Sequence, residues 1–323
     1  MKNKRILSGV QATGVPHLGN LLGAIIPSIQ LANDNESFLF IADIHSITQI
    51  KDKNILKENT LAVACAYLAF GLNTEKTVFY RQSDVAHSTE LAFYLSCFFP
   101  YQRLKLAHSF KDKKDRLDDV NVGLFTYPML MASDILLYDI DYVPVGKDQL
   151  QHIQITRDVA SRFNTQMGET FKLPEAITNE NMLVPGTDGN KMSKSRDNMI
   201  NIFTTDKMLR KQIMSIITDS KTFEEPKDYN SCNVFNIYKM IATEEEIDKL
   251  GTKYTNGNFG YGNAKQELYD LIISKYSNER DRFNYYINNS DEVEKILSIG
   301  ADKSRTISTI TLNKVKEKLG LGF

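Results

Sequence analysis

The sequence predicts an α/β protein: a parallel β-sheet covered by helices, followed by a domain built only of helices. Two observations lead to this prediction. In residues 1–200, short apolar runs typical of strands alternate with helical segments, which is the pattern of a parallel sheet with helices on both faces. After residue 206 the strand-like runs stop and only helical segments follow. The expected class is therefore Rossmann-like α/β with a C-terminal all-helical domain.

The expected elements follow one another in a regular order. In the first domain, residues 1–200, helices are expected near 20–32, 54–70, 87–99 and 148–164, with a helical insertion near 100–140. The strands are expected at Ile6–Val10, Phe38–Ala42, Val78–Tyr80, Tyr142–Val145 and Met182–Val184. In the second domain, residues 201–323, helices are expected near 206–217, 234–249, 264–278, 281–298 and 303–319, with a break at 256–262. We expect the last helix to pack back on the first domain.

Composition narrows the possible functions. A chain of 323 residues with 42% hydrophobic content can bury a large core. The net charge of -1 argues against a globally basic nucleic-acid binder, so any RNA contact must come from local patches. The 3 cysteines are far apart and form no C-x-x-C, which indicates neither a disulfide framework nor a zinc site and fits a reducing cytoplasm. No apolar stretch approaches the roughly 18 residues that span a bilayer, so no membrane partner is expected.

Two lysines three residues apart lie in a segment that is too rich in turn-forming residues for a helix interior. The run Lys191-Met192-Ser193-Lys194-Ser195 follows Gly186-Thr187-Asp188-Gly189-Asn190. Ammonium groups on a mobile loop suit negative charge that appears only in a transition state, as when pyrophosphate leaves. An isolated Lys-x-x-Lys is more often a solvated basic turn, and a second motif far upstream is needed to favour the functional interpretation.

That second motif lies between the first expected strand and the first expected helix. In the run 13–20, Gly14 and Gly19 let an anion approach the backbone, and His17 and Asn20 supply donors at the start of the helix. Taken singly, these features indicate only a tight turn and a helix cap. Neither a P-loop nor a G-x-G-x-x-G motif is present in the sequence. Together, the two motifs predict the two halves of an ATP site that activates a carboxylate.

Further stretches extend these motifs into a resemblance that covers almost the whole chain. The chain resembles the bacterial-type tryptophanyl-tRNA synthetases, which are class I aminoacyl-tRNA synthetases. The two nucleotide motifs mark the class, and the stretch from Tyr127 to Leu136 marks the amino acid. Matching stretches are Ser8–Gly14, His17–Asn20, Asp43–Thr48, Thr126–Pro128, Met131–Leu136, Val143–Gln149 and the lysine run.

The resemblance implies a site for each substrate. The implied catalytic residues are Lys191, Lys194, Gln11 and Asn20. The implied ATP contacts are Gln11, Ala12, Thr13, His17, Gly19, Asn20, Gly146, Lys147, Asp148, Met182, Lys191, Met192, Ser193, Lys194 and Ser195. For tryptophan, the implied residues are Asp134, which would accept the indole N-H, and Leu7, His45, Tyr127, Met131, Val143, Val145 and Gln149 around it. Met182 fits the core of a strand equally well, His45 and each apolar residue fit plain packing, and Asp134 fits a helix N-cap.

The implied chemistry is an in-line attack of the tryptophan carboxylate on the α-phosphorus of ATP, with Mg2+ on the phosphates and no metal-ligating protein cluster. The resulting tryptophanyl-adenylate would pass its acyl group to the 3′ end of tRNA(Trp). The family resemblance further implies anticodon contacts from the helical domain and a homodimer. Lys147 and Ile44 stand where many relatives have Glu and Gln, so contacts from these two positions stay open.

Three alternatives remain on the sequence alone. A tyrosyl-tRNA synthetase shares both nucleotide motifs but places a tyrosine hydroxyl where this chain has Leu7. An adenylating enzyme similar to pantothenate synthetase also uses a helix start with a histidine and mobile cations. A synthetase-like RNA-binding paralogue without catalysis is the third, and the presence of Gln11, Asn20, Lys191 and Lys194 argues against it.

Overall fold

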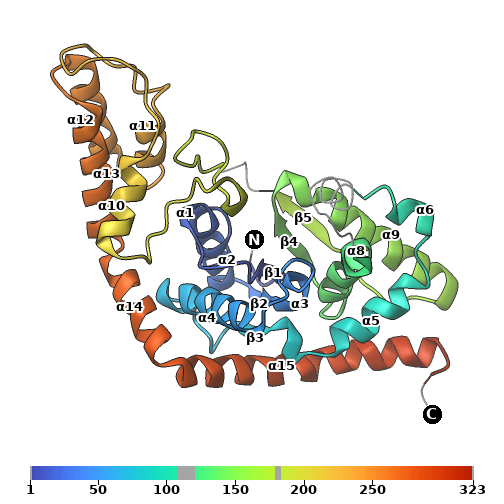
Figure 1. Ribbon diagram of the computed structural model, residues 1–323. Helices are drawn as coiled ribbons and strands as arrows, with labels where there is room; N and C mark the ends of the chain where they lie inside the picture. The colour runs from blue at the N-terminus through green and yellow to red at the C-terminus, as the bar shows by residue number, and fades with distance from the viewer. Residues whose placement is uncertain (1, 108–120, 179–182, 322–323) are drawn as a thin grey trace.

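A five-stranded parallel sheet forms the centre of the molecule (Figure 1). The computed structural model describes residues 2–107, 121–178 and 183–321. The strand order is β3-β2-β1-β4-β5, and the chain reverses its direction of progress at β1, which pairs with both β2 and β4. In such sheets ligands bind beyond the carboxyl ends of the strands at this switch point. The strands are β1 (Arg5–Gln11), β2 (Glu36–Ala42), β3 (Val78–Arg81), β4 (Tyr142–Val145) and β5 (Glu175–Thr178).

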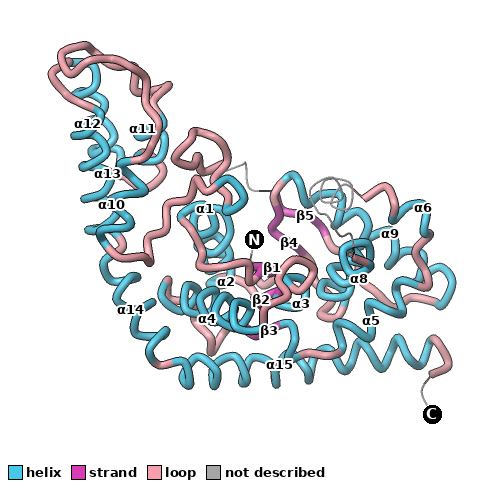
Figure 2. The backbone as a smooth tube through the Cα atoms, viewed as in Figure 1, coloured by secondary structure: helices cyan, strands magenta, loops and turns pink. Residues whose placement is uncertain are grey.

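Helices cover both faces of the sheet, as expected for parallel strands (Figure 2). The alternation along β2 shows the two faces, because successive side chains of a strand point to opposite sides. Phe38 and Phe40 belong to one apolar core, whereas Leu39 and Ile41 belong to the other. The core of Phe38 is shared with α5 (His87–Ser96), α8 (Val122–Leu136) and α9 (Leu150–Met167), and that of Leu39 with α2 (Ile26–Asn33) and α4 (Lys53–Ala69).

The described chain after Thr205 contains helices and no strand. A helical arm extends away from the sheet (Figure 1). α14 (Ser277–Asn288) packs against α4, and α15 (Ser290–Lys318) runs along β3 at the edge of the sheet. The helices of the arm are α10 (Asp206–Met214), α11 (Asn233–Tyr238), α12 (Glu244–Asn256) and α13 (Tyr261–Lys275). No helix among the described residues is both long and apolar enough to cross a membrane.

Three expected elements were wrong. The fifth strand is β5 and not Met182–Val184: Met182 lies outside the described residues, and Leu183 and Val184 belong to no strand. The helix expected at 234–249 is two helices, because Thr243 caps a new one with Glu246 in a capping box. The break expected between residues 298 and 303 is absent, since α15 is continuous there and the preceding break lies at Asn289.

Gly300 is a position at which α15 lies directly against the backbone of β3. A Cβ at this position would overlap the carbonyl oxygen of Phe79. We expect Gly300→Ala to lower the free energy of unfolding by about 1–3 kcal/mol, because backbone atoms cannot yield as the end of a side chain can. Urea denaturation measures this change. Gly262→Ala in α13 is the control, since its new methyl group would meet no neighbouring atom within 4 Å; an equal effect of both substitutions would contradict the close packing.

Candidate active site

The turn after β1 is held by a cap on the helix that follows. α1 (Leu18–Asn20) leads into a π-helical segment, Leu21–Ile25, and then into α2. His17 Nδ1 accepts a hydrogen bond from the Asn20 N-H at 3.3 Å, and Asn20 Oδ1 accepts one from the His17 N-H at 3.2 Å. Burial, and secondarily the Lys194 charge, lower the pKa of His17 to about 4, so the imidazole is neutral and can accept. Both residues therefore act as a helix cap, whatever further role they have.

The lysine run lies directly against this turn. The Gly19 N-H donates to Met192 Sδ at 3.3 Å, and the Leu18 N-H donates to the Ile200 carbonyl at 2.8 Å. Lys194 Nζ occupies the space where Gly14, with φ +138°, would carry a Cβ. Gly14 is thus required both by its backbone conformation and by the approach of Lys194. The two motifs, far apart in the sequence, meet as their pairing predicts.

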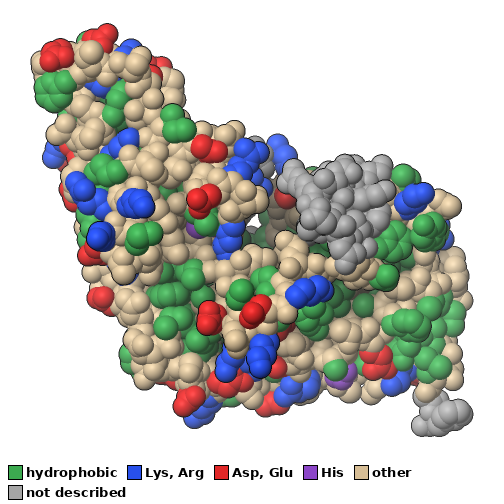
Figure 3. Space-filling model, in the orientation of Figure 1, with side chains coloured by type: hydrophobic (Ala, Val, Ile, Leu, Met, Phe, Trp, Pro, Cys, Tyr) green, Lys and Arg blue, Asp and Glu red, His purple; other side chains and the backbone are tan. Residues whose placement is uncertain are grey.

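A cavity of about 520 Å³ lies between the two motifs. The space-filling view shows a hollow on this face with Lys and Arg side chains at its rim (Figure 3). Burial lowers the pKa of the Lys194 ammonium to about 8. The predicted ATP contacts that line the cavity are Gln11, Thr13, His17, Gly19, Asn20, Lys191, Met192, Ser193, Lys194 and Ser195.

The remaining predicted ATP contacts that belong to the described residues do not line this cavity. Ala12 is fully buried, and its N-H donates to Ser46 Oγ at 2.8 Å. Gly146, Lys147 and Asp148 lie where β4 ends, and Met182 lies outside the described residues. A contact between ATP and any of these residues stays a prediction.

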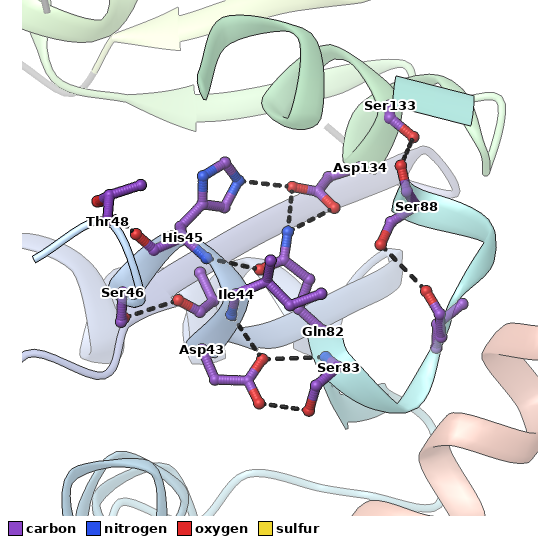
Figure 4. Close-up of polar contacts among 12 residues, drawn as sticks. Asp43, Ile44, His45, Ser46, Thr48, Gln82, Ser83, Ser88, Ser133 and Asp134 are labelled. Atoms are coloured by element: carbon purple, nitrogen blue, oxygen red, sulfur yellow. Dashed lines mark hydrogen bonds and ion pairs between the residues drawn. The ribbon is translucent and has the colours of Figure 1, made fainter. Parts of the chain in front are cut away.

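A second, fully buried polar cluster surrounds Asp134 (Figure 4). His45 Nε2 donates to Asp134 Oδ2 at 2.9 Å, and Gln82 Nε2 donates to Oδ1 and Oδ2 at 2.9 and 2.8 Å. His45 lies on α3 (Asp43–Ser46) after β2, and Gln82 begins a short 3-10 helix (Gln82–Asp84) after β3. Asp134 is not a helix cap, because it lies inside α8, whose N-cap is Asn121. Burial raises the pKa of Asp134, and the hydrogen bonds from His45 and Gln82 act against this shift.

Tyr127 connects the Asp134 cluster with the ATP-side cavity. Its ring centroid lies 4.5 Å from that of His45. Burial, and then the Asp134 charge, raise the pKa of Tyr127 to about 12, while a hydrogen bond with the Gln11 side chain acts against the shift. Gln11 also lines the cavity. The Asp134 cluster and the cavity are therefore connected through His45, Tyr127 and Gln11.

Apolar residues predicted for tryptophan lie on this same side of the sheet. Leu7 and Val143 are buried in the core shared with α8, and Met131 and Val145 pack against that core. Gln149 differs, since its side chain reaches Asp148 Oδ2 at 3.4 Å and no contact with the cluster is described for it. The structure thus places His45 and Tyr127 close to Asp134 and puts the four apolar residues in or against the core that α8, the helix of Asp134, shares; their contact with tryptophan stays a prediction.

The sequence pattern of the family described as "tRNA synthetases class I (W and Y)" matches residues 1–277. The chain belongs to this family of class I tRNA synthetases. It is 46% identical over 320 residues to the tryptophan–tRNA ligase of Fusobacterium nucleatum, with 98% of each chain covered. The resemblance found in the sequence is thereby confirmed.

Solved structures of the family agree with the fold of this class I synthetase. The crystal structure of tryptophanyl-tRNA synthetase from Campylobacter jejuni, complexed with ADP and tryptophan, matches it with a TM-score of 0.94 at 44% identity, over 98% of this chain and 100% of that chain. A tyrosyl-tRNA synthetase from Archaeoglobus fulgidus matches with a TM-score of 0.66 at 18% identity, over 87% of this chain and 90% of that chain. The latter likeness concerns the fold alone.

Several residues of the site in this class I synthetase were not predicted from the sequence. Gln49, Ile50, Leu183 and Val184 also line the cavity. Buried Asn198 fastens the lysine run: its Oδ1 accepts from the Ser193 N-H at 2.8 Å, and its Nδ2 donates to the Lys191 carbonyl at 3.1 Å. The signals in the sequence were that Gln49 and Ile50 directly follow the matching stretch Asp43–Thr48, that Leu183 and Val184 directly follow Met182, and that Asn198 closely follows the lysines.

The cavity walls of the synthetase contain no acidic side chain among the described residues. In the same part of the chain, no group of three or more His, Cys, Asp or Glu residues could hold a metal ion. Mg2+ prefers carboxylate and phosphate oxygens. The hydroxyls of Thr13, Ser193 and Ser195 offer only weak neutral oxygens, so the residues present do not form a dedicated magnesium site.

Proposed function

We infer that this class I synthetase is a tryptophan–tRNA ligase, which activates L-tryptophan with ATP and transfers it to the 3′ end of tRNA(Trp). The observation that carries the inference is the buried Asp134 carboxylate, which receives hydrogen bonds from His45 and Gln82 and is connected through Tyr127 and Gln11 to the cavity between the two ATP motifs. The identity of 46% to a tryptophan–tRNA ligase over nearly the full length of both chains supports the same conclusion.

The cavity between the motifs is the proposed ATP site. The ammonium groups of Lys191 and Lys194 would face the β- and γ-phosphates and stabilise the charge of departing pyrophosphate. Asn20 and Gln11 line the same cavity and would orient the phosphates and the tryptophan carboxylate for in-line attack. No covalent enzyme nucleophile is required, because positioning and charge stabilisation lower the barrier. The Campylobacter jejuni relative was crystallised with ADP and tryptophan, which supports the binding of an adenine nucleotide and tryptophan by this chain.

The Asp134 cluster is the proposed site of tryptophan selection. The indole N-H would donate to the carboxylate, with the ring against Leu7, Met131, Val143 and Val145. An amino acid without this donor would leave a buried carboxylate acceptor unpaired, at a cost of about 1–3 kcal/mol or more. Tyrosine carries an O-H donor at the end of a single ring, so selection against it depends on where the donor lies and on the shape of the pocket, not on the lack of a donor.

Several further proposals rest on the family resemblance. We propose that Mg2+ enters the site bound to the phosphates of ATP, since the described walls of the cavity provide no carboxylate ligand for it. Ala12, the turn Gly146–Asp148 and Met182 are proposed as additional ATP contacts, and Gln149 as a tryptophan contact. Residues 201–323 are proposed to bind the anticodon, and the chain to act as a homodimer in the cytoplasm.

ATP–pyrophosphate exchange tests the proposed activity. We expect exchange with tryptophan and none with tyrosine or pantoate. Exchange that depends on tyrosine would favour the tyrosyl enzyme, and exchange that depends on pantoate would favour the pantothenate-synthetase-like alternative. The absence of exchange with any of these acids would favour a non-catalytic paralogue. Charging of tRNA(Trp) with labelled tryptophan then tests the second step.

A further inference from the structure

Gln82 is a buried polar residue that belongs to none of the sequence motifs. Its side chain lies between the Asp134 carboxylate and the backbone of His45 (Figure 4), and only 1% of the residue is exposed. Nε2 donates to both carboxylate oxygens, and Oε1 accepts from the His45 N-H at 3.3 Å. Because an amide has one accepting and one donating end, these contacts permit only one orientation of the side chain.

We propose that Gln82 is a positioning residue for tryptophan recognition: it holds the Asp134 carboxylate in place as an acceptor for the indole N-H. This inference rests on the proposed function. Gln82 does not itself touch the substrate in this scheme. It acts through Asp134, and its contribution is therefore specific to amino acids that carry an indole N-H.

The hydrogen bonds around Asp134 leave room for one more donor. An ionised carboxylate offers about four acceptor positions. Oδ2 receives bonds from His45 and Gln82, whereas Oδ1 receives one from Gln82 alone. The hydrogen bonds from His45 and Gln82 favour the ionised form of Asp134, the form that accepts from the indole N-H, and act against the effect of burial. Loss of Gln82 would remove a contact that opposes the effect of burial on the pKa of Asp134.

The turn that contains Gln82 is held in place by hydrogen bonds and an ion pair. The Asp43 carboxylate accepts hydrogen bonds from the Ser83 N-H, at 2.9 Å, and from the Ser83 hydroxyl. Arg81 pairs with Asp84 at 2.9 Å, and Arg305 of α15 donates to the Asp84 carbonyl at 2.7 Å. The amide is therefore held by secondary-structure elements and not by a free loop, which is what accurate positioning of a binding group requires.

Substitution of Gln82 by Met tests the proposal. The matched substrates are tryptophan and an analogue in which sulfur replaces the indole N-H, β-(3-benzothienyl)alanine. In ATP–pyrophosphate exchange we expect kcat/KM for tryptophan to fall about 10-fold to 100-fold. The value for the analogue should fall far less, and KM for ATP should not change. The control is Ser133→Ala, which removes a buried hydroxyl that donates to the Ser88 carbonyl at 2.7 Å without touching the carboxylate; it should keep the wild-type preference.

A second variant guards against a fold defect in the first. Gln82→Leu also removes the donor to Asp134 and, at a similar volume, places no second carboxyl against the buried carboxylate, so we expect the same loss of preference. Binding can be followed by fluorescence of tryptophan itself, because the chain contains 0 tryptophan residues. Equal losses for both amino acids, or an unchanged preference in both variants, would overturn the proposal. A wild-type protein without tryptophan-dependent exchange would instead refute the proposed function.

Discussion

Asp134→Ala is expected to reduce kcat/KM for tryptophan by roughly 100-fold to 1000-fold. The substitution removes the acceptor for the indole N-H and also leaves two buried donors, His45 Nε2 and Gln82 Nε2, without their carboxylate. Unpaired buried donors are costly, so the pocket loses affinity beyond one hydrogen bond. Tryptophan fluorescence of the bound ligand measures affinity directly, and ATP–pyrophosphate exchange measures kcat/KM.

Asp134→Asn is the matched variant because it keeps the size of the side chain. Its amide offers one oxygen to the two protein donors and an NH2 group that cannot accept from indole. We expect a loss of tryptophan affinity close to that of Asp134→Ala, with a smaller effect on thermal stability. KM for ATP should be unchanged in both, since Asp134 does not line the cavity between the two motifs. Wild-type tryptophan affinity in Asp134→Asn would contradict the assigned role.

The fold was predictable wherever an element had a strong apolar signal. β1 to β4 each contain a short apolar run, and all four were placed within a few residues of their observed bounds. β5 was missed because it is a sheet edge whose four residues are all at least partly exposed, with only Ala176 and Ile177 apolar. The segment at 182–184 is more apolar, and it was therefore predicted as the fifth strand in place of β5. Edge strands carry less hydrophobic signal because only part of their surface is buried.

The break wrongly expected in α15 has a different cause. Gly300 lowers intrinsic helix propensity by about 1 kcal/mol relative to Ala, which favours a break in the sequence. In the structure, the missing side chain lets the helix lie against the backbone of β3. Tertiary packing therefore overrides local propensity here, and a single sequence does not contain this information.

Site residues divide in the same way. Residues within contiguous motifs, such as His17, Asn20 and Lys194, which line the cavity, could be proposed from the sequence because their neighbours form a recognisable pattern. Gln82 and Asn198 were not predicted, since each is a single polar residue whose position beside Asp134 or beside the lysine run arises from tertiary contacts. Gln82 reaches Asp134 across 52 positions of sequence, and nothing around it is periodic or unusual in composition.

Lys194→Ala is expected to lower kcat by about 100-fold to 1000-fold, because the ammonium group would stabilise charge that develops on departing pyrophosphate. Tryptophan affinity should remain near the wild-type value, since Lys194 lies on the lysine run beside Gly14 and not in the Asp134 cluster. Single-turnover formation of the adenylate separates this loss from effects on product release. A parallel loss of tryptophan binding would indicate general damage to the site.

The pH dependence of Lys194 follows from its environment. Burial lowers the pKa of its ammonium to about 8, and the charged form is therefore present below that pH and lost as the pH rises through it. Since kcat/KM reports the free enzyme, kcat/KM for ATP should decrease above a pH of about 8. Lys194→Arg should move this decrease to higher pH, because a guanidinium stays charged throughout the range.

Lys191→Ala is the control for this pH profile. Lys191 lies on the same run and lines the same cavity, but it is exposed. Its removal should lower kcat while the alkaline decrease in kcat/KM for ATP persists, because Lys194 is still present. If the decrease persisted unchanged in Lys194→Arg and disappeared in Lys191→Ala, the titrating cation would be Lys191, and the burial of Lys194 against Gly14 would have no part in the pH response.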